Sequence, residues 1–119
     1  HVVMGDFNAI SLWDFDGREQ KLEDLSHHPK GSNLGGGEKG PRVVAQMEKS
    51  GYTDSYSLFG QPAQDSFIPA TDQPIRIDYI FTSQSLTPHL THCEIIREAS
   101  GTEASDHRPV VADIEDGDW

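Results

Sequence analysis

The sequence has few basic residues, and this shortage limits the partners that it can bind. Its 119 residues carry 9 Lys and Arg against 20 Asp and Glu, which gives a formal net charge of −11 at pH 7. Proteins that hold long nucleic acids usually cluster Lys and Arg, because neutralisation of phosphates supplies most of the non-specific affinity. No such cluster is present in the sequence. Either the partner is not a long nucleic acid, or the basic residues come together only when the chain folds, or metal ions supply the positive charge that neutralises the phosphates.

The sequence also lacks paired cysteines and long apolar runs. Cys93 is the single cysteine, so no internal disulfide can form. The cysteine content therefore does not distinguish an oxidising from a reducing compartment. No apolar run approaches the roughly 18 residues of a membrane-spanning helix, and no signal-peptide pattern is present. These absences predict a soluble protein of undetermined compartment. The length is that of one domain, and the first residue, His1, agrees with a chain cut from a longer protein.

Hydrophobic periodicity predicts four strands, at residues 2–5, 52–60, 75–81 and 109–114. The first is predicted to be buried. In the third, apolar residues recur at every second position and so share one face, while Asp78 falls on the other face. Because a lone aspartate is costly to bury on so apolar a strand, we expect Asp78 to have a partner. The apolar face of the fourth strand consists of Val110, Ala112 and Ile114.

One helix is predicted over residues 41–50. Pro41 suits the first helical position, and Gly51 suits the left-handed residue that follows a helix. The apolar stripe of this helix consists of Val43, Val44 and Met47. By contrast, the segment from Ser11 to Gly40 is rich in glycine and has at most one helical turn, near residues 22–25. We predict a mobile loop there, which influences substrate choice more than folding.

Three local patterns resemble binding sites, and each is incomplete. The glycine-rich stretch 31–40 lacks the Gly-Lys-Ser/Thr of a phosphate-binding loop. Asp14, Asp16, Gly17 and Glu23 have the spacing of a calcium-binding loop. The first ligand position of that loop would be Leu12, which has no side-chain oxygen. A zinc site would need scattered residues without paired spacing, namely His27, His28, His89, His92 and Cys93. We interpret the histidines as isolated surface residues and keep a calcium-binding module as an alternative function.

Three further segments carry polar residues at strand ends and occur in a fixed order. They are "GDFNA" at residues 5–9, "RIDYIF" at 76–81 and "SDHRPVV" at 105–111. Each segment alone is weak evidence for an active site, since an Asp near a turn often caps a helix and a strand Asp is often paired with an arginine. All three segments would rarely occur together in this order by chance.

The trio resembles the endonuclease/exonuclease/phosphatase superfamily, which includes DNase I-like and exonuclease III-like nucleases, neutral sphingomyelinases, inositol polyphosphate phosphatases and deadenylases. The resemblance runs from Val2 to Ile114 and implies an α/β (α+β) fold, a four-layer sandwich of mainly antiparallel sheets with helices outside. In that family the "GDFN" strand lies near the middle of the domain. Residues 1–119 therefore resemble a single partial domain, its C-terminal half. The other half would carry the metal-binding Glu, an early Asn and a further His or Tyr.

The resemblance also implies roles for five residues. Asp6 would orient or deprotonate the attacking water, and Asn8 would position that water or bind a phosphate oxygen. His107 would bind the phosphate as a hydrogen-bond donor, with Asp78 as the partner of its other ring nitrogen. Asp6 and Asp106 would hold a metal ion, with Mg²⁺ as the default and Mn²⁺ as an alternative. We expect the five side chains to meet at one end of the sheet.

The implied activity is Mg-dependent hydrolysis of phosphoric esters, of the phosphodiesterase/nuclease or phosphatase type. The substrate stays open between nucleic acid, phospholipid and sugar phosphate, although the acidic charge disfavours a non-specific nuclease. We expect the isolated chain to be inactive, because part of the site would lie in the other half. An exposed sheet edge would invite association, including association with that half. The alternative is a non-catalytic fragment or interaction module of the same fold.

Overall fold

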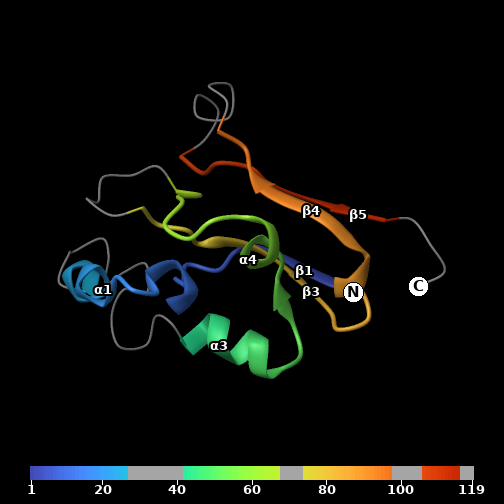
Figure 1. Cartoon of the computed structure of the whole chain (residues 1–119), viewed down its shortest axis with the longest axis horizontal. Coiled ribbons are helices and arrows are strands. Elements are labelled where there is room, and N and C mark those ends of the chain that lie inside the picture. Colours follow the sequence, from blue (N-terminus) through green and yellow to red (C-terminus); the bar gives the residue numbers. More distant parts are fainter. Residues whose placement is uncertain (27–41, 68–73, 98–105, 116–119) are drawn as a thin grey trace.

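The computed structural model describes residues 1–26, 42–67, 74–97 and 106–115. Their strands form two antiparallel sheets, one with the order β1-β3-β2 and one that pairs β4 with β5 (Figure 1). The strands are β1 (Val2–Asp6), β2 (Thr53–Asp54), β3 (Asp78–Thr82), β4 (Leu90–Ile95) and β5 (Val110–Ile114). The helices are η1 (Leu12–Phe15), α1 (Glu19–Ser26), α3 (Arg42–Lys49), α4 (Ser55–Phe59) and η3 (Thr87–His89). No helix in these ranges is long and apolar enough to cross a membrane.

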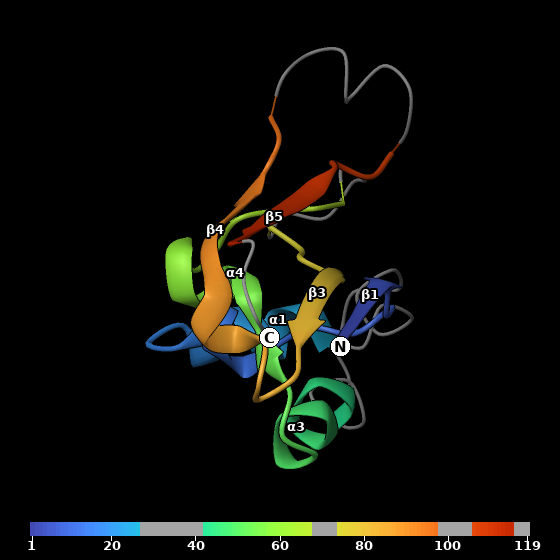
Figure 2. The same ribbon diagram turned by 90° about the vertical axis from the view of Figure 1, so that its right-hand side faces the viewer.

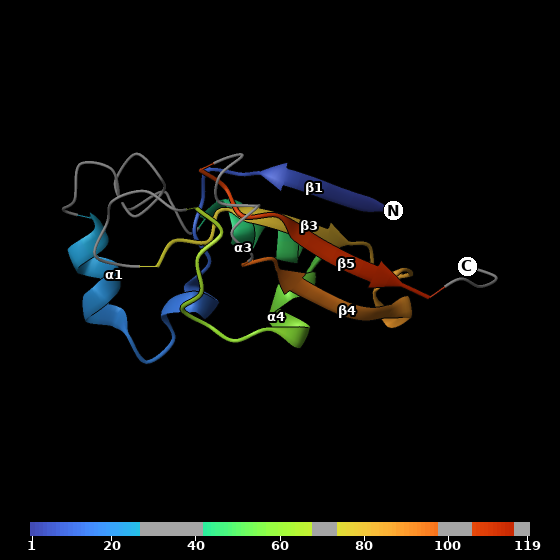
Figure 3. The same ribbon diagram turned by 90° about the horizontal axis from the view of Figure 1, so that it is seen from above.

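The elements are arranged in layers. Figures 1 and 2 show α3 on one side of the β1–β3 sheet and the β4–β5 sheet on the other side. One core cluster joins α3 to the first sheet through Val44, Tyr79 and Phe81. A second cluster, which includes Tyr56 and Cys93, joins α4 to the β4–β5 sheet. Seen from above, β1 ends on the side where β3 and β5 begin (Figure 3).

The first strand forms as predicted, but it is not buried. Among the described residues β1 pairs with β3 alone, and Met4 is 69% exposed. The central strand of this sheet is β3, which has neighbours on both edges and is buried on both faces from Tyr79 to Thr82. The face that carries Asp78 is therefore covered as well, and Ile80 on that face is 7% exposed.

The strand predicted at residues 52–60 is mostly a helix. Only Thr53 and Asp54 pair with β3, and α4 begins at the next residue. In α4, Ser55 and Tyr56 are buried. Over so few residues, alternation at every second position cannot be told from one helical turn, so the period was ambiguous.

The strand β4 was not predicted, because a bulge breaks its alternation. The pairing register shifts between Leu90 and His92, and the buried residues of the strand are Leu90, Cys93 and Ile95. Cys93 is 1% exposed and packs among apolar side chains, while the His92 ring is about half exposed. These two residues therefore do not form the alternative zinc site, and His27 and His28 lie outside the described residues. The strand at 109–114 is confirmed as β5, with Val110, Ala112 and Ile114 on its less exposed face.

The segment from Ser11 onward contains more structure than the predicted mobile loop. It forms η1 and the eight-residue α1, and Phe15 packs in a buried cluster with Ile10, Ile75 and Ile77. Residues 27–41, which include the glycine-rich stretch, lie outside the described residues. The prediction of a mobile loop was therefore wrong for residues 12–26, where the helical turn predicted near residues 22–25 forms as part of α1.

The helix predicted at residues 41–50 is confirmed as α3. Val44 is buried and Met47 packs against the core, but Val43 is 42% exposed and does not belong to the apolar stripe. Gly51 adopts a φ of 91°, which is the left-handed conformation expected after the helix.

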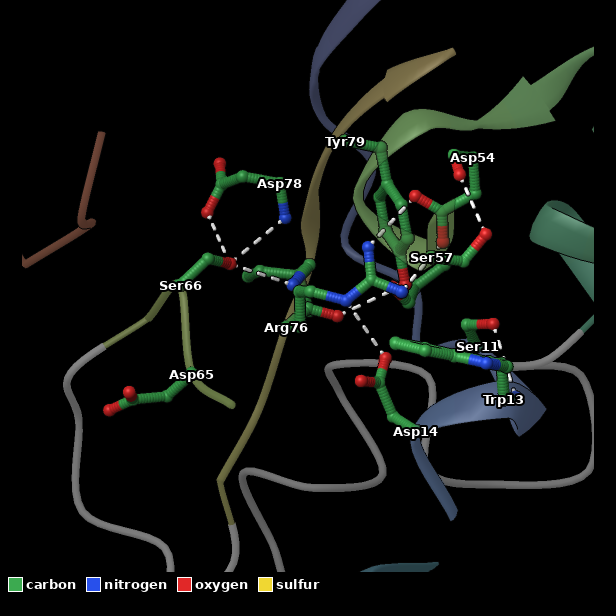
Figure 4. Close-up of polar contacts among 12 residues, drawn as sticks. Ser11, Trp13, Asp14, Asp54, Ser57, Asp65, Ser66, Arg76, Asp78 and Tyr79 are labelled. Atoms are coloured by element: carbon green, nitrogen blue, oxygen red, sulfur yellow. Dashed lines mark hydrogen bonds and ion pairs between the residues drawn. The ribbon is translucent and has the colours of Figure 1, made fainter. Parts of the chain in front are cut away.

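A buried ion-pair cluster joins η1 and β2 to the segment just before β3. Arg76, which is 2% exposed, donates to both carboxylate oxygens of Asp54 at 3.0 and 2.6 Å and to Asp14 at 3.0 Å (Figure 4). Its guanidinium carbon lies between 4.7 and 5.5 Å from the ring centroids of Trp13, Tyr56 and Tyr79. Burial raises the pKa of the Asp14 carboxyl to about 6, although Arg76 opposes this rise. The buried, arginine-paired Asp14 is unavailable to calcium, so the calcium-loop alternative was wrong.

Candidate active site

The candidate site begins where β1 ends and β3 begins. Asp6 and Asp78 are directly opposite in the antiparallel register, so their side chains point to the same face of the sheet. The pairing continues one residue further, where the Phe7 N–H donates to the Ile77 carbonyl at 2.9 Å. The register of two neighbouring strands thus brings together two carboxylates that are 72 residues apart in the sequence.

A tight turn after β1 holds the carboxylate of Asp6. Asn8 adopts a left-handed backbone with a φ of 48°, and its N–H donates to Asp6 Oδ1 at 2.8 Å. Asparagine tolerates this conformation better than most residues. The chain beyond the turn is anchored by Tyr79, whose hydroxyl donates to the Ala9 carbonyl at 2.9 Å. Asn8 therefore lies at the site, in the turn that follows the end of β1 at Asp6.

His107 comes from the segment before β5 and meets both carboxylates. Its Nδ1 lies 2.8 Å from Asp78 Oδ2, which is the contact expected from the sequence, and its Nε2 lies 3.8 Å from Asp6 Oδ2. A backbone bridge between Phe67 and His107 and a ring contact of 4.9 Å between the two residues hold this segment in place. Asp106 Oδ1 also lies 3.8 Å from His107 Nε2, and its side chain is exposed.

Three carboxylates around one imidazole favour its charged form. Partial burial lowers the pKa of His107, but the hydrogen bond and charge of Asp78, with the charges of Asp6 and Asp106, outweigh burial and raise the pKa above its usual value. The ring can therefore donate from both nitrogens over a wider pH range than an exposed histidine.

This shift predicts a pH-dependent contribution to stability. Because the folded-state pKa of His107 is raised, the stabilisation is full below its unfolded pKa of about 6.5 and is lost as pH rises through the folded-state pKa. The difference in free energy of unfolding between the chain and its His107→Gln variant isolates this contribution, since the other histidines are common to both. Urea unfolding should give a larger difference at about pH 6 than at about pH 9. An equal difference at both pH values would contradict the prediction.

Two carboxylates and one imidazole of the site form a group that could hold a metal ion. Asp6, Asp78 and His107 offer ligand atoms that all lie within 4.8 Å of one another. Within this group the Asp78 carboxylate already accepts from His107 and from Ser66, so it is the least available ligand. The exposed oxygens of Asp6 and Asp106 suit a cation such as Mg²⁺, whereas a charged imidazole repels one.

Sequence reasoning missed one residue of the site. Ser66 is fully buried, and its hydroxyl donates to Asp78 Oδ2 at 2.8 Å (Figure 4). A serine before an aromatic residue in a loop gives no periodic signal, and only the fold brings it next to β3.

The chain matches a known protein family along most of its length. The model of a family described as "Endonuclease/Exonuclease/phosphatase family" matches residues 1–107. The comparison with curated proteins found no match.

Several solved structures share the fold of this chain, among them two from Neisseria. One is described as a 3′ phosphatase, NExo, from Neisseria bound to product DNA hairpin, with a TM-score of 0.68 and 21% identity. The other is a 3′-5′ exonuclease, NExo, from Neisseria meningitidis, with a TM-score of 0.65 and 17% identity. The alignments cover 99% and 96% of this chain but 45% and 44% of those chains. The predicted fold, with mixed helices and antiparallel sheets, is confirmed, and the chain spans less than half the length of these neighbours.

Proposed function

The chain belongs to the Endonuclease/Exonuclease/phosphatase family, and on that basis we propose that it forms part of the active site of a metal-dependent phosphoester hydrolase. Its fold is that of nuclease- and phosphatase-type hydrolases. The observation that carries the proposal is the His107 ring, whose Nδ1 lies 2.8 Å from Asp78 and whose Nε2 lies 3.8 Å from Asp6. A positively charged donor beside an exposed carboxylate suits a reaction in which a water attacks an anionic phosphorus centre.

In the proposed reaction each residue has a defined task. Asp6 orients the attacking water and accepts its proton, while Asn8 positions this water or binds a phosphoryl oxygen. His107 donates from Nε2 to a phosphoryl oxygen and stabilises the charge that develops in the transition state. As the bond between the water oxygen and phosphorus forms, the ester P–O bond breaks, and the leaving oxygen takes up a proton from solvent. Asp78 accepts from Nδ1, which fixes the ring and favours its protonated form.

A divalent cation is part of the proposal. Mg²⁺, with Mn²⁺ as an alternative, would be held by Asp6 and Asp106 and would supply positive charge to the phosphoryl oxygens. Both carboxylates lie at the exposed side of His107, where a substrate can approach.

We further propose that the substrate is a phosphoester of nucleic acid. One of the structural neighbours is a 3′ phosphatase described with product DNA hairpin. The net charge of −11 works against tight binding along a polymer, so action on the end of a strand fits this chain better than non-specific cleavage. Phospholipids and sugar phosphates are the competing substrates.

We also propose that residues 1–119 alone lack part of the site. The chain spans 45% of one neighbour and 44% of the other, so further strands and metal ligands would come from outside it. With Mg²⁺ or Mn²⁺, the 119-residue chain should hydrolyse bis-p-nitrophenyl phosphate and a 3′-phosphorylated DNA hairpin no faster than buffer. A protein extended by the sequence upstream of His1, in cis or as a separate chain, should hydrolyse at least one of them.

The outcomes of this test separate the alternatives. Metal-dependent hydrolysis by the 119-residue chain, abolished in Asp6→Ala, would contradict the requirement for a second half but keep the catalytic assignment. No hydrolysis of the two esters, a phospholipid or a sugar phosphate by the extended protein would favour a non-catalytic interaction module. Hydrolysis of only a phospholipid or sugar phosphate would overturn the nucleic-acid assignment.

A further inference from the structure

The hydroxyl of Ser66 has every hydrogen-bonding position occupied. Its oxygen accepts from the N–H groups of Ile77 and Asp78 at 3.0 and 3.1 Å, and its proton goes to Asp78 Oδ2 at 2.8 Å. A serine hydroxyl has one proton and two lone pairs, so two N–H donors at the oxygen leave the carboxylate as the acceptor for the proton. Because Ser66 is fully buried, no solvent competes for these bonds.

The same carboxylate oxygen of Asp78 accepts from His107. Asp78 Oδ2 lies 2.8 Å from Ser66 Oγ and 2.8 Å from His107 Nδ1. The terminal torsion of an aspartate is broad and poorly fixed by the side chain itself. Two donors that hold one carboxylate oxygen in place restrict both side-chain torsions of Asp78, χ1 as well as the terminal one. One of these donors is the Ser66 hydroxyl, which is itself anchored to the N–H groups of Ile77 and Asp78.

The backbone around Ser66 connects the same two segments. The Ser66 N–H donates to the Ile75 carbonyl at 3.0 Å, and the Ser66 carbonyl accepts from the Arg108 N–H at 2.6 Å. The next residue, Phe67, forms bridges with both Ile75 and His107. This dipeptide therefore lies between the strand that carries Asp78 and the segment that carries His107.

We propose that Ser66 is a positioning residue for the site, which acts by fixing the Asp78 carboxylate so that it orients the His107 ring. The proposal rests on the proposed function for its effect on catalysis. Its structural part, that the hydroxyl restricts the Asp78 side chain, holds whether or not the protein hydrolyses a phosphoester.

A matched pair of variants tests the hydroxyl alone. The two variants are Ser66→Thr and Ser66→Val. Threonine and valine have nearly the same shape, and they differ in that threonine keeps a hydroxyl where valine has a methyl group. In the extended protein, kcat should fall by about 10-fold or more in Ser66→Val with KM little changed, while Ser66→Thr should stay within a few-fold of the parent. Thr82→Val is the control. It also removes the hydroxyl of a fully buried residue, but this hydroxyl lies in β3 and contacts Thr87 and not Asp78. It should leave kcat unchanged.

A second measurement does not depend on activity. In the 119-residue chain, the scalar couplings of the Asp78 β protons should report one χ1 rotamer in the parent, Ser66→Thr and Thr82→Val, and averaged rotamers in Ser66→Val. If the added methyl group prevents folding, Ser66→Ala replaces the pair and should show the same averaging and loss of kcat. Equal couplings in Ser66→Thr and Ser66→Val, or in Ser66→Ala and the parent, would overturn the proposal. If the parent hydrolyses nothing, the proposed function fails, and the couplings still decide the role of Ser66.

Discussion

Replacement of Arg76 by methionine is expected to destabilise the fold by about 3–5 kcal/mol, the scale for removing one partner of a buried ion pair. The guanidinium bonds the carboxylates of Asp14 and Asp54, and both are buried. Without Arg76 these carboxylates must stay charged in a poorly hydrated interior or take up protons. Methionine fills much of the space, so the loss reports the unpaired charges more than a cavity.

Urea unfolding followed by tryptophan fluorescence measures this effect, since Trp13 lies against the guanidinium of Arg76. Arg42→Met is the matched control, because Arg42 is an exposed arginine of α3 and its loss should change stability by less than about 0.5 kcal/mol. If Arg76→Met does not fold, Arg76→Lys should fold with an intermediate loss, as it keeps the charge but not the paired donors. An Arg76→Met variant as stable as the parent would show that the cluster contributes little.

The cluster around Arg76 could not be predicted from the sequence, because its members are far apart along the chain. Asp14 lies 62 residues before Arg76, and Asp54 lies 22 residues before it. An arginine next to an aspartate on a strand suggests a local pair, yet Arg76 and Asp78 have separate partners. Only the packing of η1 and β2 against β3 brings the two distant carboxylates to one guanidinium.

The contact between Asp78 and His107 could be predicted, although these residues are also far apart. The prediction came from the ordered motifs and the resemblance that they carry, and a lone aspartate on an apolar strand independently required a partner. The position of Asp6 follows from strand register, which sequence periodicity does not provide. Ser66 was missed because its role depends on where the loop before β3 returns to that strand.

The candidate site lies at the edge of the described fold. Asp6 ends β1, an edge strand among the described elements, and Asp106 and His107 precede β5 in the other sheet. The site thus depends on how the two sheets pack together, and the buried cluster of Arg76 lies next to the strand that carries Asp78. Loss of Arg76 is therefore expected to disturb both folding and the site, whereas loss of His107 should act mainly on the chemistry and remove only the pH-dependent stability that its raised pKa supplies.

Replacement of His107 by alanine in the extended protein is expected to lower kcat by about 100-fold or more, the scale for losing one transition-state stabiliser or acid–base group. The variant removes the donor that lies beside Asp6 and leaves the Asp78 carboxylate bonded to Ser66, so the fold should persist. Asp78→Asn should cost less, because the ring remains and only its orientation and charge are disturbed. Since Asp78 raises the pKa of His107, the loss of kcat in Asp78→Asn should grow as pH rises and the ring loses its proton.

His92→Ala, which changes an exposed histidine of β4, is the control and should keep full activity. Steady-state hydrolysis of the preferred ester over a range of pH measures all three variants, and equal rates in the parent and His107→Ala would refute the proposed role of the ring.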